Sequence, residues 1–340
     1  MKIKIYCDAL QEGEWFKNLS PSFKNSELLE INNRGRNPPI IEKLIEYDRP
    51  DIILVIDGEV KLALEKTEEV PTGHNVGQRF ARIVKSAELR IPFIYFCPFV
   101  AMKHGKYANK CFINARLFTA IENMSKIHNV TILVMNWITD DNYELIRGGR
   151  EDTELKLLMS DLLANNFSFK KSKIVKNILN KMSSEKVDRI KMHPSYEEPP
   201  NTVKIINTFS FVSDLKKRFG DFKISPRFMK NNETIFYILG MTPENCRRED
   251  PYTGTQLVYD YYWCRTGAKT NERKRNLVLN IPMVTKKRWL EANPNETHKK
   301  RHLYYSIPDM LILKDGIIIT ENLNNKQRRL MRWYQKLKST

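Results

Sequence analysis

The stretch PDIILVIDGEVKLALEKT, residues 50–67, decides how the first half of the chain folds. Residues 52–56 form a continuous apolar and partly β-branched run, which is typical of a strand buried on both faces. Asp57-Gly58 is a strong hairpin-turn signal, after which the chain returns through VKLALEKT as a second strand. The sequence therefore predicts a β-hairpin with an aspartate, Asp51, at its start.

Helix and strand patterns alternate on both sides of this hairpin. Apolar residues recur at helical spacing in some segments, and two further apolar runs indicate buried strands. We expect helices over residues 39–47, 72–90, 116–128 and 152–166, and strands over residues 91–99 and 130–137. Such alternation predicts an α/β domain over residues 1–168, with a mixed sheet flanked by helices.

The chain of 340 residues is long enough for two domains, and its positive charge lies in the second half. Residues 1–170 hold 23 of the 57 Lys and Arg and 23 of the 40 Asp and Glu, so the net charge of +17 belongs to residues 171–340. We expect a basic linker over residues 169–200 and a basic α+β domain over residues 201–340. Such a charge excess is expected of a protein that binds a polyanion such as DNA.

Cysteine spacing and the lack of long apolar runs argue against several protein classes. The five cysteines form no Cys-x-x-Cys pair, and no histidine stands at zinc-ligand spacing from them, which indicates reduced thiols and no structural zinc. No apolar run approaches the roughly 20 residues that span a bilayer, and the first residues do not have the pattern of a secretory signal. We therefore expect a cytoplasmic protein with no membrane partner.

Hairpin geometry decides which acidic residue of the returning strand can work with Asp51. A three-residue loop, residues 56–58, would place Asp51 opposite Ala63, with Glu65 as its diagonal neighbour on the same face, roughly 7 to 8 Å away. Glu59 would then lie roughly 13 Å along the strand from Asp51. A two-residue loop would instead turn Glu65 to the opposite face. We expect the first geometry, and therefore the pair of Asp51 and Glu65.

The order of these features resembles the PD-(D/E)XK nuclease superfamily, which includes most Type II restriction endonucleases. The resemblance covers residues 39–99: a Pro-Asp pair, a strand, a turn, a returning strand with an acidic residue, and a helix that contains Gln. It implies a restriction-endonuclease-like sheet and hydrolysis of double-stranded DNA with Mg²⁺, for which Mn²⁺ can substitute, held by Asp51 and Glu65. A homodimer and a cognate DNA methyltransferase are further partners that the resemblance implies.

The resemblance also assigns roles to neighbouring residues. Thr67 stands where the family usually has Lys, so it can position water but brings no positive charge. Gln78 and Arg82 match the Gln-x-x-x-Tyr signature of RecB-type members, with Arg82 in place of Tyr, and we expect them to contact the phosphate or to support the carboxylates.

Three residues near the hairpin have two interpretations each. Glu42 or Glu46 could hold a second metal ion, or both could form a solvated helix face. His74 could touch a phosphate, or it could be an incidental residue of a helix-capping loop.

Residues 308–321, PDMLILKDGIIITE, repeat the Pro-Asp, turn and strand pattern. A loop over residues 314–316 would place Glu321 opposite Asp309, which allows a second nuclease site. A structural hairpin built by the same turn rule is the simpler explanation, because no Lys, Gln or Thr stands two residues after Glu321.

Basic residues in the second half are expected to bind the DNA backbone, and they are Arg265, Lys269, Arg273, Lys274, Arg275, Lys286, Lys287 and Arg288. Two rival functions stand beside the restriction enzyme. One is a non-catalytic nucleic-acid-binding protein with a structural hairpin. The other is a nuclease of repair, phage defence or RNA cleavage without restriction specificity.

Overall fold

The computed structural model divides the chain into two compact units, Met1–Pro194 and Ser195–Thr340. It describes residues 2–31, 36–46, 48–71, 73–105, 108–192, 203–240, 242–244, 275–291 and 308–319. No helix within these residues combines the length and the apolar character needed to cross a bilayer. The three cysteines that the structure describes, Cys7, Cys97 and Cys111, are free.

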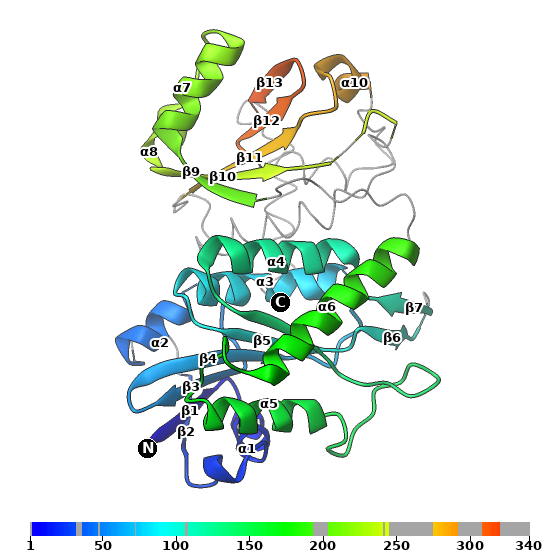
Figure 1. Ribbon diagram of the computed structural model, residues 1–340. Coiled ribbons are helices and arrows are strands. Elements are labelled where there is room, and N and C mark those ends of the chain that lie inside the picture. Colours follow the sequence, from blue (N-terminus) through cyan, green and yellow to red (C-terminus); the bar gives the residue numbers. More distant parts are fainter. Residues whose placement is uncertain are drawn as a thin grey trace. The chain divides into compact units, whose positions relative to one another are not determined.

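A six-stranded mixed sheet forms the centre of the first unit (Figure 1). Its strand order is β2-β1-β3-β4-β5-β8. β3 and β4 are the two strands of the predicted hairpin, and β1 pairs antiparallel with β3, whereas β5 and β8 continue the sheet in parallel from β4. The bounds are β1 (Ile3–Cys7), β2 (Glu27–Glu30), β3 (Ile52–Ile56), β4 (Glu59–Lys66), β5 (Phe93–Cys97) and β8 (Ile132–Asn136).

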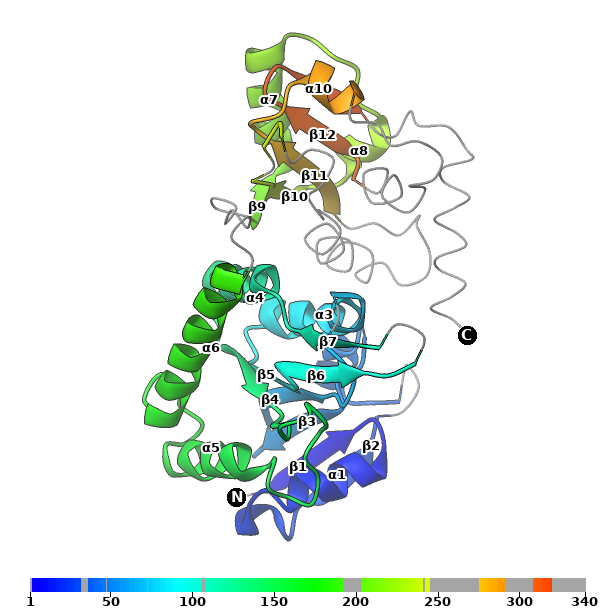
Figure 2. The ribbon, with the colours of Figure 1, turned by 90° about the vertical axis from the view of Figure 1, so that its right-hand side faces the viewer.

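Helices cover both faces of this sheet (Figures 1 and 2). α3 (Gly73–Glu88) and α4 (Ala115–His128) lie on one face, and α1 (Leu10–Lys17) and α5 (Thr153–Ala164) lie on the other. The short helix α2 (Pro39–Leu44) contacts α3. The unit also contains a 3-10 turn, η1 (Pro21–Phe23), and a separate hairpin of β6 (Val100–Lys103) with β7 (Asn109–Phe112).

The observed elements confirm the expected α/β architecture, a mixed sheet flanked by helices. Every residue of β3 and β5 is buried, as their continuous apolar runs predict. The sequence patterns do not single out β1, although it lies inside the sheet next to β3, because its sequence, IKIYC, contains a lysine and so lacks the continuous apolar run of β3. Segments with a long helical period or a continuous apolar run were therefore the predictable part of the unit.

The expected linker over residues 169–200 does contain the boundary between the two units, between Pro194 and Ser195, but most of its length is a helix and not a linker. Residues Lys173–Met192 form helix α6, which packs against α4, α5 and β8 and so belongs to the first unit. Its buried apolar side chains, Val175, Ile178 and Met182, recur at helical spacing among many lysines. The lysines give the segment the composition of a linker, but the spacing of these few apolar residues gives it one buried face.

The second unit contains a five-stranded mixed sheet in the order β13-β12-β11-β10-β9. Helices α7 (Thr208–Phe219) and α8 (Pro226–Lys230) pack on this sheet through an apolar cluster that includes Phe211, Leu215, Phe228, Val278 and Ile312. The strands are β9 (Val203–Asn207), β10 (Glu233–Ile238), β11 (Arg275–Ile281), β12 (Met310–Leu313) and β13 (Gly316–Ile319), and a short helix, α10 (Lys286–Glu291), follows β11.

Candidate functional site

The turn between β3 and β4 has two residues, so the expectation of a three-residue loop is wrong. Ile56 pairs with Glu59, which leaves Asp57 and Gly58 as the loop. Both have positive φ, 50° and 86°, as the type I′ turn preferred by two-residue hairpins requires. Without a correction further along the strands, such a turn would direct Glu65 to the face opposite Asp51.

A β-bulge supplies that correction. Val55 pairs with Val60, but Leu54 pairs with Leu62, so Lys61 is an extra residue on β4. The bulge shifts the pairing by one residue, and Ile52 then pairs with Leu64. Continued by one residue beyond Ile52 and Leu64, this register places Asp51 opposite Glu65. Asp51 and Glu65 therefore lie on the same face of the hairpin, as expected. The three-residue turn and the diagonal placement that we expected are wrong.

Deleting Lys61 is expected to preserve the site, because it removes only the extra residue of the bulge and leaves a regular hairpin with Asp51 opposite Glu65. Inserting one alanine after Ala63 is the matched change, and it should direct Glu65 away from Asp51. We expect the deletion to lower the free energy of unfolding by less than about 1 kcal/mol and the insertion to lower it severalfold more. Urea unfolding of both variants measures this, and equal losses would contradict the bulge assignment.

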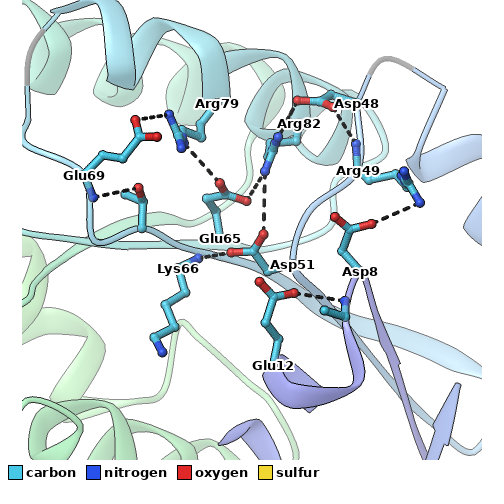
Figure 3. Close-up of polar contacts among 12 residues, drawn as sticks. Asp8, Glu12, Asp48, Arg49, Asp51, Glu65, Lys66, Glu69, Arg79 and Arg82 are labelled. Atoms are coloured by element: carbon cyan, nitrogen blue, oxygen red, sulfur yellow. Dashed lines mark hydrogen bonds and ion pairs between the residues drawn. The ribbon is translucent and has the colours of Figure 1, made fainter. Parts of the chain in front are cut away.

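Arg82 of α3 connects the two carboxylates (Figure 3). Its Nη1 makes a short hydrogen bond to Oε2 of Glu65 and lies 3.7 Å from Oδ1 of Asp51. The other edge of the guanidinium faces Asp48, whose Oδ2 accepts from Nε at 2.9 Å and from Nη2 at 2.7 Å. One partly buried arginine thus contacts three acidic residues, of which Glu65 lies on β4 and Asp48 and Asp51 lie in the segment before β3.

A second arginine, Arg79, approaches the same carboxylate from one helical turn earlier (Figure 3). Its Nε lies 3.4 Å from Oε1 of Glu65, and its Nη1 donates to Oε2 of Glu69 at 2.9 Å. Because Arg79 and Arg82 are three residues apart on α3, both side chains reach the end of β4. Glu65 therefore faces two positive charges.

Asp51 is held in place by the backbone of the facing strand. Its Oδ2 accepts a hydrogen bond from the Lys66 N–H at 2.6 Å. Glu12, from the start of α1, points toward Asp51 from the side opposite Glu65 (Figure 3), and its Oε2 accepts from the Ala9 N–H at 3.2 Å. The site thus combines three neighbouring carboxylates, those of Glu12, Asp51 and Glu65.

Burial makes these carboxylates hard to ionise. Burial and, to a smaller extent, the nearby Glu12 together raise the pKa of Asp51 to about 6, against the opposing effects of the Lys66 N–H and Arg82. Burial also raises the pKa of Glu65, to about 8, against the opposing effect of Arg82. For Arg82, burial alone would lower the pKa, but Glu65 and Asp48 raise it above its ordinary value, so the guanidinium stays charged.

These pKa values predict how stability depends on pH. A carboxyl group whose pKa is raised by folding stabilises the fold below its unfolded pKa, and that stability is lost as the pH rises through the folded pKa. In EDTA, the free energy of unfolding should therefore fall between about pH 4 and pH 8, and Asp51 alone should contribute roughly 3 kcal/mol of this loss, mostly between about pH 4 and pH 6, at about 1.4 kcal/mol per pKa unit.

Urea unfolding at several pH values measures this slope. The control is the double variant Asp51→Asn, Glu65→Gln, which lacks both titrating groups and should have a flatter profile. Identical slopes in the two proteins would show that these carboxyl groups do not cause the dependence.

Thr67, which we expected at the site, and two nearby lysines, Lys61 and Lys66, differ in where their side chains lie. Thr67 is buried just after the end of β4, and its Oγ1 accepts from the Glu69 N–H at 3.2 Å, so the hydroxyl proton remains available to donate. Lys66 extends away from Glu65, and its Nζ lies 4.6 Å from the ring centre of Trp15 and 5.0 Å from that of Trp137. Lys61 pairs with the exposed Glu59 at 2.5 Å, outside the site.

The upstream helix contributes no metal ligand among the described contacts. Oε1 of Glu42 accepts from the backbone and side-chain N–H groups of Asn37, at 3.0 and 2.8 Å, and Oε2 of Glu46 lies 2.6 Å from Nζ of Lys85. Whether Glu42 holds a metal ion therefore stays a prediction. Gln78 and His74 lie on α3, but their side chains are outside the described residues.

At the possible second site, the Asp309 carboxylate accepts hydrogen bonds from a backbone N–H and from an arginine. Its Oδ2 accepts from the Leu277 N–H at 2.9 Å, and its Oδ1 accepts from Nη2 of Arg227 at 2.7 Å. Leu313 pairs with Gly316, so the loop has two residues and the three-residue loop predicted here is also wrong. Glu321 lies outside the described residues, so the pairing of Asp309 with Glu321 stays a prediction.

Four of the eight basic residues expected to contact DNA lie within the described part of the chain. Arg275 is largely buried and donates from Nε to Oε2 of Glu233 at 2.5 Å, so it is not available as a backbone contact in this conformation. Lys286 and Lys287 are exposed on α10, and Nε of Arg288 donates to the Pro243 carbonyl at 2.9 Å. The other four residues, Arg265, Lys269, Arg273 and Lys274, lie outside the described residues.

The carboxylates of Asp51 and Glu65 are ligands of the kind that Mg²⁺ takes in proteins. Mg²⁺ prefers oxygen ligands and often takes only one or two carboxylates, with water and phosphate oxygens completing its shell. Nη1 of Arg82 already places a positive group against both Asp51 and Glu65. Within the described residues, no group of three or more Asp, Glu, His or Cys is arranged to hold a metal ion, so Asp51 and Glu65 would be the protein ligands.

Three residues of this site, Glu12, Asp48 and Arg79, are missing from the sequence prediction. Arg79 could have been found from its spacing to Arg82, since both fall on one helical face. No signal in the sequence points to Glu12, whose position depends on β1 and α1.

The chain was compared with protein-family models, curated proteins and solved structures, and none of them matches the chain.

Proposed function

We propose that this protein is a Mg²⁺-dependent DNA endonuclease of the PD-(D/E)XK type, a Type II-like restriction enzyme that cuts a specific double-stranded sequence. The observation that carries the proposal is that the carboxylates of Asp51, just before β3, and Glu65, on β4, meet at Nη1 of Arg82, with a second arginine of the same helix beside Glu65. Hydrolysis of a phosphodiester needs positive charge beside the phosphate and a carboxylate-held metal ion, and this arrangement provides groups for both.

The order of elements supports a restriction-endonuclease-like fold. The hairpin of β3 and β4 leads into α3, and the chain returns to the sheet as β5, parallel to β4 and next to it. This order places the carboxylates and the α3 arginines at one end of β4, and it agrees with the resemblance in residues 39–99.

In the proposed reaction, Asp51 and Glu65 would hold Mg²⁺, which as a Lewis acid would polarise the phosphate and lower the pKa of water. The Lys66 N–H orients the Asp51 carboxylate. The Thr67 hydroxyl, which has a proton to donate, would position water. Arg82 and Arg79 would supply the positive charge that Lys usually brings in the family, because Lys66 points away from the site.

Affinity for DNA would come mainly from the second half of the chain. Residues 171–340 hold 34 Lys and Arg against 17 Asp and Glu, and exposed lysines such as Lys286 and Lys287 are suited to phosphate contacts. Contacts of this kind hold the duplex without reading its sequence, so the bases would be read by other residues.

Incubating the purified full-length protein with plasmid DNA tests the proposal, with Mg²⁺, with Mn²⁺ and with EDTA. We expect discrete fragments with either metal ion and intact plasmid in EDTA. A smear would indicate a nuclease without restriction specificity, as expected for a repair or defence enzyme. Binding without cleavage under all conditions would contradict the proposal.

One observation favours a second candidate, a non-catalytic nucleic-acid-binding protein. Both candidate ligands already have an internal positive partner in Arg82, so the hairpin satisfies its own charges without a metal ion. Structural ion-pair networks raise or lower pKa values in the same way as active sites do. DNA affinity that is unchanged by Mg²⁺, together with intact plasmid, would identify this second function.

A further inference from the structure

Arg82 lies against both carboxylates that would hold a metal ion. Its Nη1 contacts Glu65 and lies 3.7 Å from Asp51, so it stands between the two carboxylates that would be the ligands. A divalent cation bridging the same two carboxylates would meet this guanidinium at close range. Two positive groups in one buried site repel each other strongly, because the surrounding protein screens charge poorly.

Asp48 gives the guanidinium a second attachment outside the carboxylate pair. Its Oδ2 accepts from Nε and Nη2, on the opposite edge of the group from Nη1. The Asp48 side chain is 36% exposed, whereas that of Glu65 is 3% exposed. Arg82 could therefore keep its contact with Asp48 while Nη1 moves off Glu65 toward an anion that approaches from the more open side.

We propose that Arg82 and a divalent cation compete for the Asp51–Glu65 pair, and that a DNA phosphate releases the pair by drawing the guanidinium to itself. This inference rests on the proposed function, and it adds that metal and DNA bind cooperatively. Without DNA, the arginine holds the carboxylates and metal binds weakly. With a phosphate as the new partner of Arg82, the carboxylates are free to accept the ion, so each ligand increases the affinity for the other.

Mn²⁺ binding by the full-length protein without DNA tests the competition, with free Mn²⁺ measured by electron paramagnetic resonance. Arg82→Met and Arg82→Lys remove or weaken the internal cation, since lysine lacks the fork that holds two partners at once. We expect both variants to bind Mn²⁺ at least about tenfold more tightly than the wild type, with Arg82→Met the tighter of the two. Arg147→Met is the matched control, because Arg147 is exposed and pairs with Glu68 outside the site.

Thermal unfolding tests the cooperation. For the wild type, we expect Mg²⁺ plus a short DNA duplex to raise Tm by more than the sum of their separate effects, and for Arg82→Lys we expect the two effects to add. Circular dichroism checks that each variant is folded, and Arg82→Lys carries the test if Arg82→Met does not fold.

The outcomes separate this inference from the proposed function. If Asp51→Asn abolishes Mn²⁺ binding but neither Arg82 variant tightens it, the carboxylates bind metal without competition, and only the inference is overturned. If neither the wild type nor any Arg82 variant binds Mn²⁺ at millimolar concentration, the proposed function fails and the inference fails with it.

Discussion

Replacing Asp51 by Asn, or Glu65 by Gln, is expected to slow plasmid cleavage on the order of 1000-fold, which corresponds to roughly 4 kcal/mol of lost transition-state stabilisation. Each change removes one of the two negative charges that would hold the metal ion and preserves the shape of the side chain. In Asp51→Asn, the new amide oxygen can still accept from the Lys66 N–H, so the hairpin should stay folded.

Single-turnover cleavage of plasmid DNA measures the effect, and gel-shift binding in EDTA shows whether DNA affinity remains. We expect affinity to stay within about threefold of the wild type, because most phosphate contacts would lie in the basic half. Glu59→Gln is the matched control, since Glu59 is exposed and pairs with Lys61 outside the site. Equal losses in Glu59→Gln and Glu65→Gln would refute the assignment of Glu65.

Arg82→Met is expected to lower the free energy of unfolding by about 3 to 5 kcal/mol at pH 8 without metal. The change removes the positive partner that Glu65, Asp51 and Asp48 share, and it leaves the first two as buried carboxylates with too little positive charge beside them. The loss should shrink at pH 5, where both carboxyl groups are protonated and the missing positive charge matters less.

Two comparisons make this prediction specific to the buried cluster. Arg147→Met removes an arginine of an exposed ion pair and should change stability by less than about 1 kcal/mol. The double variant Arg82→Met, Glu65→Gln should be more stable than Arg82→Met alone, because it also removes a buried negative charge that has lost its main partner. If the second change destabilises the first variant further, Arg82 stabilises the fold through packing and not through its charge.

Local sequence patterns predicted the framework of the first unit. The run IILVI indicated a buried strand, Asp57-Gly58 indicated a tight turn, and the apolar spacing after residue 72 indicated an amphipathic helix, because each depends on residues close together in the chain. Hairpin reasoning placed Asp51 and Glu65 on one face, and the resemblance to the nuclease superfamily added Arg82. It failed for residues 173–192, where a few apolar residues among many lysines determine a helix.

Only the tertiary structure decided how the site is assembled. The face of Glu65 depends on the bulge at Lys61, and no local signal marks that residue, because the bulge forms when β4 adjusts to both β3 and β5. The partners Glu12 and Asp48 reach the site through β1, α1 and the chain before β3, whose packing is a long-range property. The sequence by itself therefore determined that two carboxylates would meet at this hairpin, and the family resemblance pointed to Arg82 beside them. The charge balance among them was decided by burial, which depends on the complete sheet and its covering helices.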